Sequence, residues 1–525
     1  MRFVSAAFIA FLAVLFAAYY LLPKKWQWPL LLIASVTFFM LDDWRNGIFI
    51  GITAATTFGT ALWIEQINTS QKAYLQEHRT MLDKAQKKAF KSRILSKKRT
   101  VLLLGLVLNL GVLAVTKYTN FLIDNINRFL SHKLVRFDEL FIPIAISYYT
   151  FQSVSYIIDV YRDKQPAQRN FFKYALFVCF FPQLVQGPIS RYGDLGHQLC
   201  TPHKFEGKTI SFGLMRILWG YFKKVVIADR LVTAVIALAG GEGYTGAFVL
   251  MTMLFYAFQL YCDFTGGIDI TIGIAQTLGI TLAENFNLPY FSKNIREYWN
   301  RWHITMGAWF TDYIFYPISV CKPMLKLSKW SRSHLGNAAG KRVTVYLSSF
   351  AVWLATGVWH GAAWNFIVWG LVNWVVIMAS QELEPLYDRF HGKFHLRGKL
   401  PYEIFQIIRT ILLMSAIRLF DVYRNVPTTF RRIFSMFTAR NWGEVFNGDL
   451  LKLGLGIHDY VLLAVCLLIV LGVSLCKVKW GSVRELLYVK KPIFYLSMGV
   501  LFLSILIFGA YGIGFDFSGF IYNQF

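Results

Sequence analysis

Long apolar segments recur along the whole chain and determine what kind of protein it can form. Of its 525 residues, 56% are hydrophobic and 16% are charged, an apolar share above that of ordinary soluble domains. A run of about twenty apolar residues crosses the hydrocarbon core of a bilayer as a helix. The sequence therefore predicts an integral membrane protein. The long segments are 3–22, 47–64, 101–116, 140–160, 210–227, 247–262, 343–355, 365–378, 404–419, 460–476 and 493–511, with shorter ones at 29–41, 171–185 and 268–280.

The residue pattern within these segments predicts helices. None of them alternates apolar and polar residues as barrel strands do. We therefore expect an all-α, polytopic membrane protein of roughly a dozen helices, forming a single domain over residues 1–525, with some helices too short to cross fully. The segment 3–22 lacks a small-x-small cleavage site and has a long apolar run, so we interpret it as the first spanning helix and not as a signal peptide.

Basic residues are concentrated between the apolar segments. The formal net charge is +25, and this placement follows the positive-inside rule, so we expect contact with membrane lipid and no nucleic-acid partner. Residues 66–100 carry ten Lys or Arg against two Asp or Glu. We predict that they form a cytoplasmic loop, partly an amphipathic surface helix near anionic lipid. The basic residues at 24–25 and 477–491 also belong inside, which predicts that both chain termini lie outside.

Signatures of soluble cofactor chemistry are missing from the sequence. It contains no phosphate-binding loop and no Gly-rich dinucleotide fingerprint. Its six cysteines form no C-x-x-C pair and show no metal-like spacing with histidine, so we interpret them as packing residues. We expect no metal and no permanently bound cofactor, which leaves the membrane core or its loops as the place for any chemistry.

The stretch Thr356–Asn365 places a histidine inside an apolar region. His360 is accompanied by Gly357, Trp359 and Trp364. An ionisable side chain at membrane depth usually faces a cavity or pathway, glycines allow close backbone approach, and indoles can wall a pocket while donating a hydrogen bond. We therefore predict a pocket containing a base. The alternative is a neutral histidine hydrogen-bonded between packed helices.

A second polar region follows residue 295, where aromatic and charged residues are too densely mixed for a lipid-facing span. We expect a re-entrant or interfacial helix that lines a cavity, with Arg301, Trp302 and His303 side by side. Asp312 lies about half a turn out of phase with His303 on an ideal helix, so the two share a cavity only if the chain bends, and Gly307 is the expected place. The alternative is an aromatic belt with interfacial charges.

Ordered motifs across residues 186–365 carry a family resemblance. The chain resembles the membrane-bound O-acyltransferase (MBOAT) family, and within it the bacterial branch of the alginate O-acetylation membrane subunit, the peptidoglycan O-acetyltransferase and the teichoic acid D-alanyl transfer protein. The resemblance implies a bundle of helices around a central cavity. The matching motifs are Q-G-P-I-S-R-Y (186–192), D-F-T-G-G-x-D-I-x-x-G (263–273), E-N-F-N-x-P-Y (284–290), I-R-E-Y-W-N-R-W-H-I-T (295–305), D-Y-I-F-Y-P (312–317) and G-V-W-H-G-A-A-W (357–364).

The resemblance implies acyl transfer at two histidines. His360 matches the family's catalytic histidine, and His303 matches its second histidine. Moving an acyl group from a thioester such as acetyl-CoA to a hydroxyl needs a base near neutral pH, and burial favours the neutral, basic imidazole. Other expected binding residues orient the donor or steady the developing oxyanion: Arg301, Trp302, Asp312, Trp359, Trp364 and Asn365.

The tail at residues 514–525 resembles the F-I-Y-F-x-F ending of the same bacterial branch. The resemblance implies that Tyr522 carries the acyl group from His360 to an external partner of the SGNH-hydrolase type. The charge pattern places this tail outside the membrane independently. The alternative is a tail whose aromatic residues anchor at the interface.

Three functions remain open from the sequence. We predict an enzyme of the bacterial cytoplasmic membrane that O-acetylates a cell-surface polysaccharide from acetyl-CoA. A teichoic acid D-alanyltransferase is the second reading, although that relative usually leaves the tyrosine motif to a small partner chain. A transporter or flippase without covalent chemistry is the third, and it would call for internal repeats with paired broken helices, which the sequence does not show.

Overall fold

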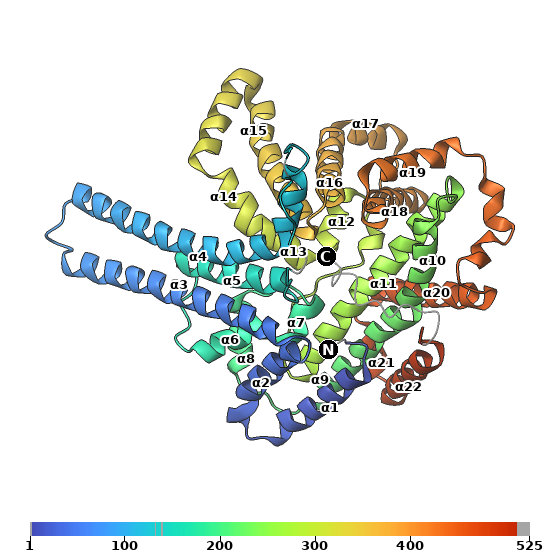
Figure 1. Cartoon of the computed structure of the whole chain (residues 1–525), viewed down its shortest axis with the longest axis horizontal. Helices are drawn as coiled ribbons and strands as arrows, with labels where there is room; N and C mark the ends of the chain where they lie inside the picture. Colours follow the sequence, from blue (N-terminus) through green and yellow to red (C-terminus); the bar gives the residue numbers. More distant parts are fainter. Residues whose placement is uncertain (1–2, 132, 138–139, 512–525) are drawn as a thin grey trace. The chain divides into compact units, whose positions relative to one another are not determined.

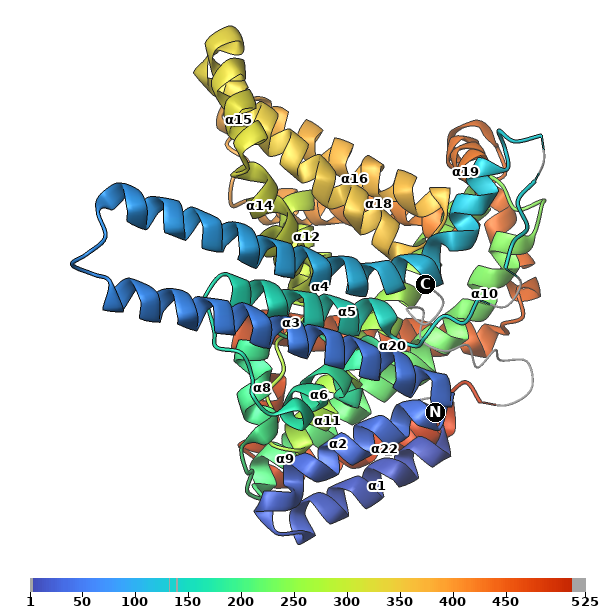
Figure 2. The same ribbon diagram turned by 60° about the vertical axis from the view of Figure 1, so that its left-hand side comes forward.

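The computed structural model describes residues 3–131, 133–137 and 140–511, and these are overwhelmingly helical (Figures 1 and 2). Over this part of the chain, an isolated antiparallel bridge between Phe286 and Trp302 is the only β pairing. The all-α prediction is therefore confirmed. The chain divides into two compact units, Met1–Ser211 with Ile274–Leu282 and Phe212–Gly273 with Ala283–Phe525.

The first unit is built around two long helices, α3 and α4. They pack against each other and against α5, and a buried hydrogen bond of 2.8 Å joins the hydroxyls of Thr57 on α3 and Tyr174 on α6. The helices of this unit are α1 (Ala6–Leu21), α2 (Gln27–Met40), α3 (Trp44–Glu77), α4 (Lys84–Ile126), α5 (Ile146–Tyr161), α6 (Phe171–Cys179), α7 (Phe181–Gln186) and α8 (Tyr192–Cys200).

The basic segment 66–100, predicted as a loop that is partly an amphipathic helix, is helical over most of its length. Helix α3 continues to Glu77 and α4 begins at Lys84, so only residues 78–83 form a connection, closed by a capping box between Asp83 and Gln86. Helices of 34 and 43 residues are about 50 and 65 Å long, well beyond a bilayer core of about 30 Å. Their basic ends therefore extend past the apolar parts as a helical hairpin, which is visible in Figure 1.

The second unit contains the remaining helices, and it carries the motifs from residue 263 onward. Helix α16 packs against both α15 and α18. The helices are α9 (Gly207–Tyr221, of which residues 212–221 belong here), α10 (Asp229–Gly240), α11 (Ala247–Thr277, up to residue 273), α12 (Ile295–Arg301), α13 (Ile304–Phe310), α14 (Tyr316–Ser319), α15 (Lys322–His360), α16 (Trp364–Glu382), α17 (Glu384–Phe394), α18 (Leu400–Tyr423), α19 (Val426–Thr438), α20 (Ile457–Trp480), α21 (Val483–Tyr488) and α22 (Lys491–Phe508), with π-helical segments Phe222–Ala228 and Thr311–Phe315.

Within the described residues, six helices are long and apolar enough to cross a membrane: α3, α4, α11, α16, α20 and α22. Helices α1 and the pair α6–α7 are apolar but shorter, as the mixture of long and short segments predicted. Helix α11 has 67% of its apolar window buried by protein, whereas α22 has 11%. Since a lipid-facing helix keeps its apolar surface out of the protein core, α11 is a central helix and α22 a peripheral one.

Helices α9 and α11 of the second unit cross at glycines and are joined by buried charges. A β-carbon at Gly220 would lie 2.6 Å from the carbonyl oxygen of Gly266, so the two backbones meet directly. The ammonium of Lys224, on the π-helical segment that follows α9, lies 2.5 Å from the Asp263 carboxylate on α11 and 2.7 Å from Asp229. The family motif that begins at Asp263 thus holds this helix crossing together.

Candidate active site

His360 ends helix α15 and lies beside the first turns of α16. The chain is extended at Gly361 (φ −179°) before α16 begins at Trp364. A β-carbon at Gly361 would lie 2.3 Å from the Phe366 ring, and one at Gly357 would lie 2.6 Å from the Phe366 carbonyl oxygen. Glycine at these two positions therefore lets α15 and α16 meet closely and fixes where the histidine side chain lies.

Aromatic rings surround the imidazole of His360, which is only 5% exposed. The ring centroids of Trp369, Trp359 and Phe366 lie 4.6, 5.0 and 6.4 Å from it. The indole N–H of Trp369 is buried and has no hydrogen-bond partner within the described residues. A buried donor of this kind usually has a partner, so the Trp369 N–H is a candidate donor on a ring that lies beside His360.

His303 is positioned by an unusual local backbone. Helix α12 ends at Arg301, and the next residues run alongside the E-N-F-N motif. Two backbone hydrogen bonds of 3.0 Å flank Trp302 and His303 there. The Asn287 N–H donates to the Arg301 carbonyl, and the Ile304 N–H donates to the Asn285 carbonyl. His303 itself has φ +49°, a left-handed conformation that costs a non-glycine residue about 1 to 3 kcal/mol and occurs often at functional sites.

The side chain of Asn285 holds the imidazole of His303. The Asn285 Oδ1 lies 3.2 Å from His303 Nδ1 and accepts hydrogen bonds from the N–H and hydroxyl of Thr305 at 3.1 and 2.9 Å. Because this oxygen can only accept, Nδ1 carries the proton and the lone pair of the neutral ring is on Nε2. Burial, and after it the positive charge of Arg418, lowers the pKa of His303 from 6.5 to about 3, so this ring is neutral at physiological pH.

The two histidines, 57 positions apart in the sequence, contact the same indole. The ring centroid of Trp359 lies 6.1 Å from that of His303 and 5.0 Å from that of His360. The bend that brings His303 here is at His303 itself, and the prediction of a bend at Gly307 is wrong, since Gly307 lies inside α13. A left-handed residue between two short helices turns the chain where no glycine is present.

Sequence reasoning missed Arg418, a buried residue of α18 that lies over three indoles. Its guanidinium is 4.8, 5.3 and 5.7 Å from the ring centroids of Trp369, Trp302 and Trp299, and 3.1 Å from the Asp421 carboxylate. Planar arginine suits such stacking. The Arg418 side chain thus contacts both Trp302, which precedes His303, and Trp369, whose ring lies beside His360. An arginine at the end of an apolar segment was the only sequence signal.

The other predicted binding residues take different positions. Asn365 is buried and donates to the Phe420 carbonyl at 3.1 Å, which leaves its Oδ1 without a hydrogen-bond partner within the described residues. Arg301 forms an ion pair with Glu297 at 2.5 Å on α12. Asp312 is half-buried in the π-helical segment after α13. Trp364 is 47% exposed, so it does not wall the buried site as Trp359 does.

Across the described part of the chain, no three His, Cys, Asp or Glu side chains come together in a way that could hold a metal ion. The rings beside His360 are those of Trp359, Trp369 and Phe366, and an imidazole in such surroundings suits general acid–base chemistry.

Comparison with known proteins agrees with this arrangement. The chain belongs to the membrane-bound O-acyltransferase family, whose model matches residues 98–420. It is therefore a membrane O-acyltransferase. The family assignment that we made from the sequence motifs is confirmed. The predictions of an acyltransferase and of a membrane protein are confirmed with it.

Individual relatives narrow the comparison further. The chain is 35% identical over 400 residues to a probable alginate O-acetylase AlgI of Azotobacter vinelandii, covering 73% of this chain and 70% of that protein. It is 34% identical over 323 residues to a peptidoglycan O-acetyltransferase of Helicobacter pylori, covering 56% and 58%. It is also 28% identical over 251 residues to a teichoic acid D-alanyltransferase of Bacillus subtilis, covering 47% and 59%.

Proposed function

We propose that this enzyme transfers an acetyl group from acetyl-CoA toward a cell-surface polysaccharide, with His360 as the base. The observation that carries the proposal is a buried histidine at a close helix crossing, walled by indoles and sharing one of them with a second, neutral histidine. The similarity to alginate O-acetylases supports acetyl as the group and a polysaccharide as the final acceptor.

The chemistry assigns one task to each group. His360 takes the proton of the attacking hydroxyl, whose oxygen bonds to the thioester carbonyl carbon. The carbon–sulfur bond then breaks, and the imidazolium returns the proton to the departing thiolate. The Trp369 N–H is suited to the oxyanion that forms between these events, and the Asn365 Oδ1 is suited to accept a hydrogen bond from the donor.

We further propose that the attacking hydroxyl is that of Tyr522 and that an SGNH-hydrolase-type partner outside the membrane takes the acetyl group onward. Tyr522 and the whole tail 514–525 lie outside the described residues, so this step is supported by the sequence motif and by the basic connections that orient the chain in the bacterial cytoplasmic membrane. A cavity through the family fold would connect a cytosolic donor with this external tail.

The test uses the purified full-length protein in nanodiscs with acetyl-CoA labelled on its acetyl group. We expect label on the C-terminal peptide of the wild type, detected by mass spectrometry, and none after Tyr522→Phe or His360→Ala. Tyr511→Phe serves as the matched control tyrosine. Label that persists in Tyr522→Phe would contradict the relay, and equal donor consumption by wild type and His360→Ala would contradict the catalytic assignment.

D-alanyl transfer is the second candidate, favoured by the similarity to teichoic acid D-alanyltransferases. The same assay with a D-alanyl thioester decides between the two donors. Consumption of the D-alanyl donor but not of acetyl-CoA, with the same dependence on His360, would replace acetylation by alanylation.

A further inference from the structure

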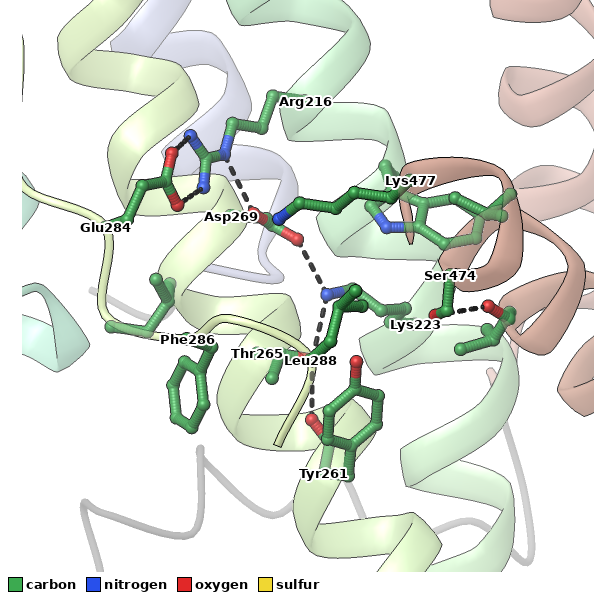
Figure 3. Close-up of a pocket in the computed structure, with 14 residues that line it drawn as sticks. Arg216, Lys223, Tyr261, Thr265, Asp269, Glu284, Phe286, Leu288, Ser474 and Lys477 are labelled. Atoms are coloured by element: carbon green, nitrogen blue, oxygen red, sulfur yellow. Dashed lines mark hydrogen bonds and ion pairs between the residues drawn. The ribbon is translucent and has the colours of Figure 1, made fainter. Parts of the chain in front are cut away.

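A second polar cavity lies within the second unit, lined by α9, the π-helical segment 222–228, α11, residues 284–288 and α20 (Figure 3). Its volume is about 100 Å³, room for roughly three water molecules and comparable with one phosphate group. None of the residues assigned to acyl transfer lines it. The Phe286 ring of the lining packs against Trp302, with ring centroids 5.0 Å apart, so the cavity adjoins the segment that holds His303.

Ion pairs organise one side of this cavity. The guanidinium of Arg216 binds Asp269 at 2.8 Å and both oxygens of Glu284 at 2.6 and 2.7 Å. The ammonium of Lys223 binds the other oxygen of Asp269 at 2.6 Å and the Thr265 hydroxyl at 2.8 Å. Figure 3 shows these contacts as a continuous chain across the cavity wall. The two carboxylates are thereby fully engaged.

Lys477 adds a further positive charge to the same wall. It projects from the last turn of α20 toward the Asp269 region (Figure 3), and no ion pair or hydrogen bond with any described residue engages its ammonium. The described lining thus holds three cationic side chains, Arg216, Lys223 and Lys477, against two carboxylates. An excess positive charge in a partly enclosed polar site favours an anion.

Arg484 on the neighbouring helix α21 strengthens this positive field. Its guanidinium donates to the Phe212 carbonyl at 3.0 Å and lies 5.6 Å from the centre of the Phe212 ring. Burial, and after it the charge of Arg216, lowers the pKa of Arg484. The positive charges of Arg484 and Arg216 therefore lie close enough to repel each other, and both contribute to the positive potential near the cavity.

The position of the cavity along α20 indicates which anions can reach it. The end of α20, the connection that follows and the start of α22 carry Lys479, Arg484, Lys490 and Lys491 against Glu485, the composition of a cytoplasmic connection. On that side of a membrane the abundant anionic groups are phosphates, either of soluble nucleotide thioesters or of phospholipid headgroups.

We propose that this cavity binds a phosphate group, with Lys477 as its recruiting cation and the Arg216–Asp269–Lys223 chain as the frame that holds the site open. Strongly hydrated lysine recognises phosphate as a point charge. Binding of a donor phosphate here would rest on the proposed acetyl-CoA function. Binding of a phospholipid headgroup would be independent of that function.

The test measures binding and not turnover, so it succeeds or fails separately from the acyltransferase assay. Wild-type protein in a phosphate-free maltoside detergent is titrated with inorganic pyrophosphate, with coenzyme A and with phosphatidylglycerol, and the dissociation constant of each is measured. The variant is Lys477→Gln, chosen because this lysine is exposed at a helix end. The matched control is Lys479→Gln, two residues further along, whose ammonium lies over the Trp480 ring.

We expect at least one phosphate probe to bind wild type and Lys479→Gln equally and Lys477→Gln about tenfold more weakly, the effect of one charge-assisted contact. If coenzyme A and pyrophosphate bind in a Lys477-dependent way, the phosphate group in the cavity comes from the acyl donor. If only phosphatidylglycerol does so, the phosphate group comes from a lipid headgroup. Equal affinities for all probes in the two variants, or no binding by wild type, would overturn the proposal.

Discussion

The histidine site and the charged crossing of α9 and α11 are two polar regions of the same unit, and they satisfy their buried groups in opposite ways. Around His360 and His303 the neighbours are rings and amides, and both imidazoles contact the Trp359 indole. Around Lys224 and Asp263 the neighbours are opposite charges at 2.5 to 2.7 Å. Rings and amides, with the Arg418 guanidinium stacked over the indoles, leave a neutral base available for proton transfer, whereas paired charges stabilise a helix crossing. Changes in the first region should therefore alter activity, and changes in the second should alter stability.

The largest expected effect is on catalysis at His360. Replacing His360 by Ala removes the proposed base, and general-base catalysis contributes about 10²- to 10⁴-fold, so turnover of labelled acetyl-CoA should fall by that factor. The thermal unfolding midpoint measured in parallel should change far less. The exposed His458→Ala variant is the control and should keep full turnover. A His360→Ala protein that turns over normally would remove the distinction between the two regions.

Next in size is the effect of Lys224→Met on stability. The substitution removes the ammonium that pairs with the buried carboxylates of Asp263 and Asp229, and breaking a buried pair in this way costs about 3 to 5 kcal/mol. Thermal unfolding in detergent should show a clear loss of stability. Asp229→Asn, which leaves the Lys224–Asp263 pair intact, should lose less. Equal losses in the two variants would show that the pair with Asp263 is not the main contact.

Arg418 is a strong cation close to the histidines, so its substitution sharpens the comparison. Arg418→Lys keeps the charge but loses the planar stacking over Trp369, Trp302 and Trp299, which is worth about 1 to 2 kcal/mol when desolvated. Turnover should fall roughly tenfold, and the near-ultraviolet circular dichroism of the tryptophans should change with it. Arg409→Lys on the same helix should change neither. A change in stability alone would make Arg418 a packing residue.

The last expected effect, and the one with no loss at neutral pH, is a pH dependence of stability from His303. Unfolded histidine gains a proton below about pH 6.5, whereas folded His303 stays neutral down to about pH 3. The unfolded state therefore binds more protons in this window, and stability should fall as the pH drops, by roughly 1.4 kcal/mol per pH unit from this residue. His303→Gln should flatten the thermal midpoint between pH 6.5 and 4.5, and the exposed His458→Gln should not.

The sequence predicted the class of the protein correctly, and it singled out His360 as the candidate base, because both inferences depend on local composition. Long apolar runs require membrane helices, and a histidine within one of them is conspicuous, as His360 was. The prediction failed where tertiary packing sets the backbone. The left-handed turn at His303 follows no glycine signal, and its conformation depends on pairing with Asn285 and Phe286, which lie seventeen or more positions earlier.

The helical structure of segment 66–100 is a second difference between the prediction and the structure, and helix propensity and packing account for it. The charged residues of segment 66–100 suggested a loop, yet strong helix formers such as Ala, Lys and Gln continue a helix beyond the apolar part when a packed partner helix supports it. The Tyr74 and Phe90 rings, 4.4 Å apart, supply that contact between α3 and α4. Composition alone does not show which two distant segments meet.

By itself the sequence determined that this protein is an all-helical membrane enzyme and that His360, His303 and the ordered motifs belong to one family of acyltransferases. Only the tertiary structure decided that the two histidines share the Trp359 ring, that Arg418 lies over three indoles, and that Lys477 lines the same cavity as the ion pairs of Asp269. The physical reason is that charge, polarity and helix length are local properties, whereas the contact of one side chain with another depends on how the helices cross.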